Sequence, residues 1–222
     1  MSNYPIDNTN KVKRIPKRGH YDRATIYEVL DAGFLCHIGF TVENRPFVIP
    51  TSYGRKGDKI YLHGASTSRM MVNLQEGLPM CLTVTHLDGL VLARSSFHHS
   101  MNYRSAVCFG TAHLVAGEEK EEALKIISDQ ILLGRWEEAR EPIAKELKAT
   151  TVLCMNIDQA SAKIRTGPPG DEKADYELPI WAGVVPCQQV WGTPEADPLL
   201  TEGIPLADSA KQLLDAQKIE GF

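Results

Sequence analysis

Three short apolar segments joined by tight turns constrain the fold of this chain most strongly. Residues 34–40, 46–53 and 59–63 are rich in β-branched, aromatic and other apolar side chains. Glu43, Asn44 and Arg45 connect the first two segments, and the run GRKGD connects the second to the third. Such turn residues between β-like segments are typical of hairpins. Because connections this short leave no room for a crossover helix, the sequence predicts antiparallel strands.

The rest of the chain continues with short strands and few helices. We predict helices beginning after the capping residue Asp22 and at Ser66, a long helix over 118–140, and a last helix over 206–217. The remaining strands are predicted over four ranges and a final extended segment, namely 80–87, 106–116, 150–157, 160–165 and 178–189. Many short strands with few helices between them predict a mainly β chain with flanking helices (α+β). We expect a closed antiparallel barrel, although a β-sandwich would show the same pattern of strands.

Composition divides the chain into three parts. Residues 1–20 form a basic N-terminal arm, residues 21–190 a single barrel domain, and residues 191–222 a C-terminal tail with a short helix. No recognition motif follows the basic run in the arm and the net charge is -4. We therefore expect no nucleic-acid partner.

Cysteine usage and hydropathy bear on location. The five cysteines form no CxxC pair and mostly lie in apolar runs, which favours a reducing compartment. We find no signal peptide and no apolar run of the roughly 18 residues that a membrane span needs. A cytoplasmic protein without membrane contact is the expectation.

Small hydroxyl residues and an arginine follow the strand that ends near His63. Gly64 lacks bulk, so a ligand or another backbone segment can approach closely. The hydroxyls of Ser66 and Ser68, together with Arg69, could converge on a phosphate at the start of a helix. An ordinary helix cap beside a surface arginine is the alternative. No Walker A or GxGxxG motif is present.

Two further clusters could complete a ligand site. Pro50, Thr51, Ser52 and Tyr53 close an apolar strand, and their backbone could bond the polar edge of a ring system; an edge strand entering a turn is the alternative. The run HHSMNYRS at residues 98–105 could line a planar cofactor. It could also bind a metal with His63 or His86, provide a catalytic histidine, or close the barrel or a dimer interface as a polar loop.

Residues 22–186 resemble the pyridoxamine 5'-phosphate oxidase-like FMN-binding split barrels, and most closely the branch of the nitroimidazole-resistance proteins. The motifs that carry the resemblance are VIPTSYGRKGDKIYLHGASTSRMM, VTHLDGLVLARSSFHHSMNYRS, VCFGTAHLV and ELPIWAGVVP. The resemblance implies a six-stranded split barrel that binds FMN between the two subunits of a homodimer. It implies these cofactor-binding residues: Pro50, Thr51, Ser52, Tyr53, Leu62, His63, Gly64, Ser66, Ser68, Arg69, Ser100, Asn102, Tyr103, Arg104 and Trp181.

The expected function follows from the same resemblance. The RxVLLK pattern and the arginine-rich C-terminal signature of true pyridoxamine phosphate oxidases are missing, so we do not expect that reaction. We expect an FMN-dependent oxidoreductase that passes a hydride to a small organic acceptor, such as a nitro compound or a quinone, with His63 as proton donor. The alternatives are a non-catalytic flavin-binding or sensor module and a split barrel that holds haem or a deazaflavin.

Overall fold

The two predicted hairpins are present in the computed structural model, which describes residues 2–219. Strands β2 (Leu35–Val42), β3 (Arg45–Lys56) and β4 (Lys59–Ala65) pair in antiparallel order. Glu43 and Asn44 have positive φ angles of 49° and 62°, the conformation of a two-residue hairpin turn.

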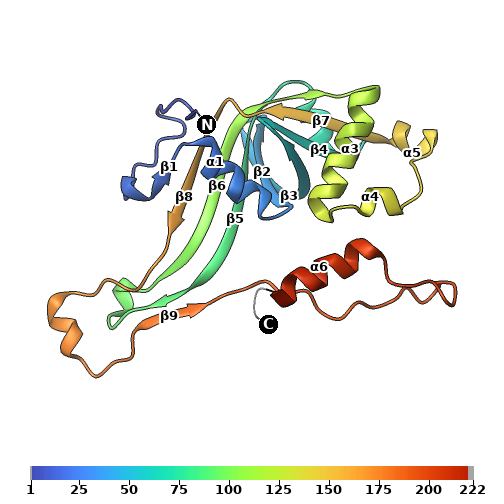
Figure 1. Cartoon of the computed structure of the whole chain (residues 1–222). Coiled ribbons are helices and arrows are strands. Elements are labelled where there is room, and N and C mark those ends of the chain that lie inside the picture. The colour runs from blue at the N-terminus through green and yellow to red at the C-terminus, as the bar shows by residue number, and fades with distance from the viewer. Residues whose placement is uncertain (1, 220–222) are drawn as a thin grey trace.

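A closed barrel forms when three later strands join this meander (Figure 1). These are β5 (Pro79–Leu92), β6 (Ser100–Leu114) and β7 (Thr150–Asn156). The pairing runs β6-β7-β4-β3-β2-β5 and returns to β6, which closes the predicted six-stranded barrel. The whole sheet has nine strands, because β8 (Gln159–Arg165) pairs with β6, β9 (Gly183–Pro186) with β5, and β1 (Gly19–His20) with β8.

Apolar side chains from the strands fill the barrel, and two helices contribute to its core. Tyr53 and Leu62 are fully buried there. Helix α1 (Arg23–Asp31) inserts Leu30 and is capped by Asp22, whose carboxylate accepts a hydrogen bond of 2.9 Å from the backbone of Thr25. Helix α2 (Arg69–Leu74) inserts Met71.

The outer helical layer differs from the single long helix predicted over 118–140. Helix α3 (Glu118–Ile131) ends before Gly134, whose φ of 82° no helix can include, and α4 (Arg135–Glu138) follows. Helix α5 (Ala144–Ala149) was not predicted. Helix α3 packs Ala123 and Ile127 against the outer side of β4 and β7.

The polar run at 98–105 belongs mainly to a strand and does not form a connection. Strand β6 starts at Ser100, six residues before the predicted start, and β5 ends at Leu92, five residues after its predicted end. A short turn, η2 (Ser96–His98), joins them. We call residues 87–103 together with β9 the extension, because they continue past the barrel (Figure 1). The apolar pattern of the sequence did not indicate the full length of β5 and β6, because these parts of the strands lie outside the apolar core.

The N-terminal arm packs on the barrel, whereas the C-terminal segment after β9 is mostly exposed. In the N-terminal arm, which includes η1 (Pro16–Arg18), Tyr4 is 1% exposed and its hydroxyl donates to Asp58. The C-terminal part contains η3 (Lys173–Glu177) and α6 (Asp208–Ile219), close to the helix predicted over 206–217. Residue 1 and residues 220–222, the ends of the predicted arm and tail, lie outside the described residues. No helix within 2–219 has the length and apolar content to cross a bilayer.

Candidate functional site

Strands β3 and β4 pair along only part of their length. They are hydrogen-bonded from Tyr53 opposite Leu62 to Lys56 opposite Lys59. Before Tyr53, β3 pairs only with β2, and beyond Leu62, β4 pairs only with β7. One edge of β3 over residues 45–52 therefore has backbone groups without a strand partner, which is where an external ligand can bond. We call this divergence of the two strands the split.

Side chains of β3 alternate between the core and the outside. Pro50 is exposed and Ser52 half-buried, so both are accessible from outside the barrel. The ring of Tyr53 is fully buried and its hydroxyl donates to the carbonyl of Leu30. The predicted packing of this ring on a ligand is therefore wrong, because the ring is part of the barrel core. The carbonyl of Thr51 accepts a hydrogen bond of 3.4 Å from the Cys36 thiol.

The connection from β4 to α2 presents free polar groups beside the split. Ser68 is the N-cap residue of α2, but its side chain does not cap the helix. Arg69 is exposed, and its guanidinium carbon lies 5.1 Å from the centre of the Phe47 ring on β3. Among residues 2–219 Arg69 has no carboxylate partner, and neither Ser66 nor Ser68 uses its hydroxyl in a hydrogen bond. This Ser66–Arg69 loop can therefore offer two hydroxyls and a guanidinium to an anion.

The neighbouring residues of β4 have different environments. A Cβ at Gly64 would lie 3.0 Å from Cε of Met71, so the glycine leaves room for this side chain of α2. Leu62 is fully buried in the core, so its side chain presents no surface to a ligand and only its backbone could take part in a site. His63 is half-buried, and its Nδ1 is buried without a hydrogen-bond partner. Burial lowers the pKa of His63, so its imidazole is neutral at pH 7.

Two of the predicted ligand residues on β6, Asn102 and Arg104, bond other groups within the chain. Asn102 is buried, donates to the carbonyl of Gly167 at 3.2 Å and accepts from Arg165. Arg104 forms an ion pair of 2.9 Å with Asp88. Ser100 is exposed and Tyr103 is half-buried.

The extension leads away from β4 and carries these residues with it (Figure 1). Trp181, which is 66% exposed, lies two positions before β9 and therefore beside the extension. One chain therefore does not bring Ser100, Tyr103 or Trp181 to the Ser66–Arg69 loop, and the single groove predicted from the sequence is not formed within one subunit.

The histidines of the polar run also have local partners. Nδ1 of His99 accepts a hydrogen bond of 3.0 Å from the backbone of Ala93, and His98 lies 3.7 Å from Glu172. Over the described part of the chain, no three or more His, Cys, Asp or Glu side chains are grouped to hold a metal ion.

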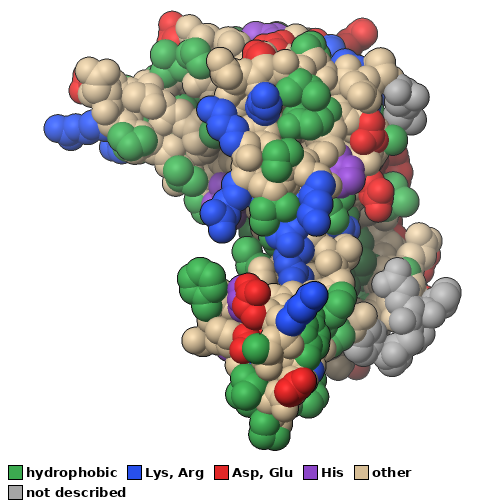
Figure 2. Space-filling model, turned by 90° about the vertical axis from the view of Figure 1, so that its left-hand side faces the viewer, with side chains coloured by type: hydrophobic (Ala, Val, Ile, Leu, Met, Phe, Trp, Pro, Cys, Tyr) green, Lys and Arg blue, Asp and Glu red, His purple; other side chains and the backbone are tan. Residues whose placement is uncertain are grey.

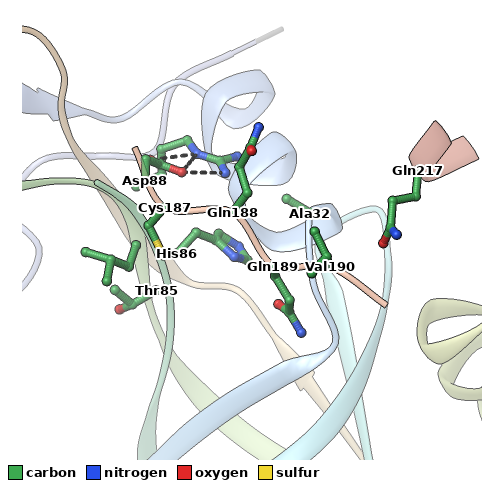
Figure 3. Close-up of a pocket in the computed structure, with 11 residues that line it drawn as sticks. Ala32, Thr85, His86, Asp88, Cys187, Gln188, Gln189, Val190 and Gln217 are labelled. Carbon is green, nitrogen blue, oxygen red and sulfur yellow. Dashed lines mark hydrogen bonds and ion pairs between the residues drawn. The ribbon is translucent and has the colours of Figure 1, made fainter. Parts of the chain in front are cut away.

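A cavity of about 620 Å³ that the sequence did not reveal lies between β5 and the C-terminal segment (Figure 3). His86, Cys187 and the Asp88–Arg104 pair line it, together with three glutamines. Gln217 of α6 fixes one side, since its side chain bonds both the backbone nitrogen and the carbonyl of Trp191. Residues more than one hundred positions apart meet here, so no local sequence pattern could have indicated it.

Comparison with known proteins identifies related families and structures. The family model described as pyridoxamine 5'-phosphate oxidase matches residues 22–164. The structure of the flavocytochrome Anf3 from Azotobacter vinelandii is 39% identical with a TM-score of 0.87, covering 96% of this chain and 99% of that one. An FAD- and haem-binding protein from Mycobacterium smegmatis is 36% identical with a TM-score of 0.85, covering 88% and 97%.

A more distant structure shares the fold. A protein assigned to 5-nitroimidazole antibiotic resistance from Bacteroides thetaiotaomicron is 24% identical with a TM-score of 0.53, covering 66% of this chain and 86% of its own. At this identity the likeness shows the fold alone. A comparison with curated sequences gave no significant match.

Proposed function

The chain belongs to the pyridoxamine 5'-phosphate oxidase family, whose model matches residues 22–164, and from this premise we propose that it is a flavin-dependent redox protein. The observation that carries the proposal is the Ser66–Arg69 loop. Its arginine has no carboxylate partner among the described residues, and the helix cap Ser68 leaves its hydroxyl free. These groups fit the phosphate that FMN and FAD share.

The split provides the rest of a flavin site in this proposal. Unpaired backbone groups of β3 near Ser52 would bond the polar edge of the flavin ring, while Ser66, Ser68 and Arg69 hold the phosphate. When bound, the flavin supplies hydride or single-electron transfer. The protein contributes orientation and charge, and a nitro compound or a quinone is the kind of acceptor we propose.

We propose haem as a second cofactor, because the two structures reported above at 39% and 36% identity are described as a flavocytochrome and as an FAD- and haem-binding protein. His63 fits the role of an iron ligand. Its lowered pKa keeps the imidazole in the neutral form that binds metals, and since Nδ1 is buried, Nε2 is the nitrogen that would reach an iron. The same lowered pKa makes His63 a poor proton donor at pH 7, which favours ligation over the acid role expected from the sequence.

A homodimer would complete the site. On the outer side of the sheet, Leu90, Met101 and Val185 lie in one row across β5, β6 and β9, and each is 45–49% exposed. Val48 of β3 is 68% exposed. Apolar side chains exposed in this way mark an interaction surface. A second subunit seated there would bring Tyr103, Arg104 or Trp181 to the partner's flavin, which the single chain does not do.

The five free cysteines are consistent with the proposed cytoplasmic location.

Absorption spectroscopy and mass analysis of the released ligands test the cofactors. We expect a flavin band whose ligand mass distinguishes FMN from FAD, and a Soret band if haem is present. NAD(P)H-driven reduction distinguishes an enzyme from a non-catalytic flavin module. A protein that takes up neither FMN nor FAD contradicts the proposal, and His63→Ala should remove the Soret band while leaving the flavin band.

Arg69→Ala is the sharpest single variant for the flavin site. Hydrogen bonds to a charged group contribute about 1.5–3 kcal/mol, so flavin affinity should fall about tenfold or more. Arg135→Ala, which removes an exposed arginine of α4, is the matched control and should keep the wild-type affinity. If Arg69→Ala retains its flavin as well as this control does, the phosphate site lies elsewhere.

A further inference from the structure

Arg165, at the end of β8, is a buried arginine without a counter-ion. Its side chain is 6% exposed, and the guanidinium donates to the Asn102 side chain and to the carbonyls of Gly167 at 3.2 Å and Pro168 at 3.3 Å. All three acceptors are neutral. Its Nε is buried and bonds to nothing. Burial of a charge is unfavourable unless an opposite charge compensates for it.

Neighbouring arginines show what a compensated charge looks like in this molecule. Arg94 forms an ion pair of 3.0 Å with Asp171, and Arg104 one of 2.9 Å with Asp88. Both pairs lie on or beside the extension. Strand β8 ends there, with Arg165 opposite Tyr103. Arg165 differs from them because no carboxylate within residues 2–219 lies within ion-pair distance of it.

Additional positive charge surrounds Arg165. Lys163 lies two positions earlier on the same face of β8, and η1 packs on β8 close enough for the charge of Arg18 to act on Arg165. Burial lowers the pKa of Arg165 and the charge of Arg18 lowers it further. Neither Lys163 nor Arg18 forms an ion pair with any described residue.

Lys163 of β8 and Arg18, which directly precedes β1, lie on a side of the molecule with further cations. Figure 2 shows Lys and Arg side chains gathered in a band down the side of the molecule that carries β1 and β8. The arm contributes four more cations, none of which forms an ion pair with a described residue: Lys11, Lys13, Arg14 and Lys17. Such a band attracts anions and raises their concentration near Arg165.

We propose that Arg165, Lys163 and Arg18 form a binding site for the phosphate group of a small ligand, separate from the Ser66–Arg69 loop. The planar guanidinium of arginine suits phosphate oxygens, and two further cations match a multiply charged anion. Tyr103, directly opposite Arg165 on β6, provides a half-buried aromatic side chain beside the site. The three cations of this site are not those of the Ser66–Arg69 loop, whereas Tyr103 is also a residue that the proposed dimer would bring to the partner's flavin.

Calorimetric titration with inorganic pyrophosphate at low ionic strength tests this site on the full-length protein as purified. We expect binding that Arg165→Gln weakens about tenfold or more, the equivalent of losing one charge-assisted hydrogen bond. Lys145→Gln, an exposed lysine of α5, is the matched control and should bind as the wild type does. Arg69→Ala should leave this binding in place, and any pyrophosphate binding that it removes belongs to the Ser66–Arg69 loop.

Surface variants keep the proposal falsifiable if Arg165→Gln does not fold. Lys163→Gln and Arg18→Gln should each weaken pyrophosphate binding several-fold with an unchanged melting temperature. The proposal is overturned if the wild type does not bind pyrophosphate, or if binding survives these changes. It is also overturned if Arg69→Ala abolishes binding, or if citrate binds as tightly as pyrophosphate, which would indicate a carboxylate site.

Discussion

At the scale of single residues, Asp58 binds the N-terminal arm to the barrel through hydrogen bonds. Its carboxylate accepts hydrogen bonds from the hydroxyls of Tyr4 and Tyr27 and from Nε of Arg23 at 3.1 Å. Burial alone would raise the pKa of Asp58, but the bonds from Tyr27, Tyr4 and Arg23 outweigh it and lower the pKa. The turn between β3 and β4 is thereby linked to a residue near the start of the chain.

Asp58→Asn should destabilise the fold. An amide oxygen is a weaker acceptor than a carboxylate for two hydroxyls and a guanidinium, so we expect a loss of about 1–3 kcal/mol in the free energy of unfolding. Urea denaturation measures it. Asp197→Asn, in the exposed C-terminal segment, is the control and should unfold as the wild type does.

The contribution of Asp58 should depend on pH in one direction. Because its folded-state pKa is lowered, the stabilisation is present above the ordinary carboxyl pKa of about 4 and is lost as pH falls through the lower folded value. The difference in stability between wild type and Asp58→Asn should therefore be constant from pH 5 to pH 7, about one unit or more above that pKa, and shrink below it. A difference that grows on acidification contradicts this assignment.

The role of a single residue could be predicted from the sequence where that role depends on residues close to it along the chain. Asp22 was correctly predicted as a helix cap, and Ser68 and Arg69 do lie where a strand passes into a helix. The orientation of Tyr53 could not be predicted, because it depends on which face of β3 meets the core. The ion pair of Arg104 with Asp88 depends on pairing across two strands and was likewise beyond reach.

At the scale of elements, the position of α3 depends on a glycine of β3. A Cβ added at Gly54 would lie 2.7 Å from the backbone nitrogen of Ile127 and 2.8 Å from its Cα. These are backbone atoms of a helix, so they cannot move aside as a flexible side chain can. The absence of a side chain at Gly54 therefore allows α3 to lie directly on the strand.

Gly54→Ala should displace α3 and lower stability by about 1–3 kcal/mol, the usual cost of overpacking a well-packed contact. Thermal unfolding followed by circular dichroism measures the change. Gly170→Ala, at a loop position where a Cβ would meet no atom within 4 Å, is the matched control and should melt like the wild type. Equal melting temperatures for the two variants would mean that α3 is not held against Gly54.

Elements were predictable from the sequence where a turn or cap defined them. The hairpins around Glu43–Asn44 and Gly57 were correct because their turn residues require special backbone angles. The helix over 118–140 was predicted too long, since Gly134 alone was a weak signal against strong helix formers on both sides. Strand β6 was predicted too short because its first residues are polar.

At the scale of the whole molecule, a closed barrel carries an extension that leaves several large apolar side chains exposed. The six barrel strands bury their inner faces, whereas Leu90, Met101 and Phe97 on the extension remain 46–89% exposed. Stable association between proteins buries at least about 1,000 Å² with a central apolar patch. The exposed apolar side chains of the extension, with Val48 on the outer face of the barrel, are the candidates for such a patch, and from them we propose that the protein is a dimer.

Leu90→Asp should convert this dimer to a monomer. Leu90 lies opposite Met101 and beside Val185, so an aspartate there would bury a charge in the centre of the apolar row. Light scattering coupled to size-exclusion chromatography measures the mass, and Leu199→Asp is the control, because that leucine is 92% exposed in the C-terminal segment. If the partner subunit completes the flavin site, Leu90→Asp should also lose flavin although it leaves the Ser66–Arg69 loop intact. A monomer that keeps its flavin would place the whole site within one chain, and an unchanged dimer would place the interface elsewhere.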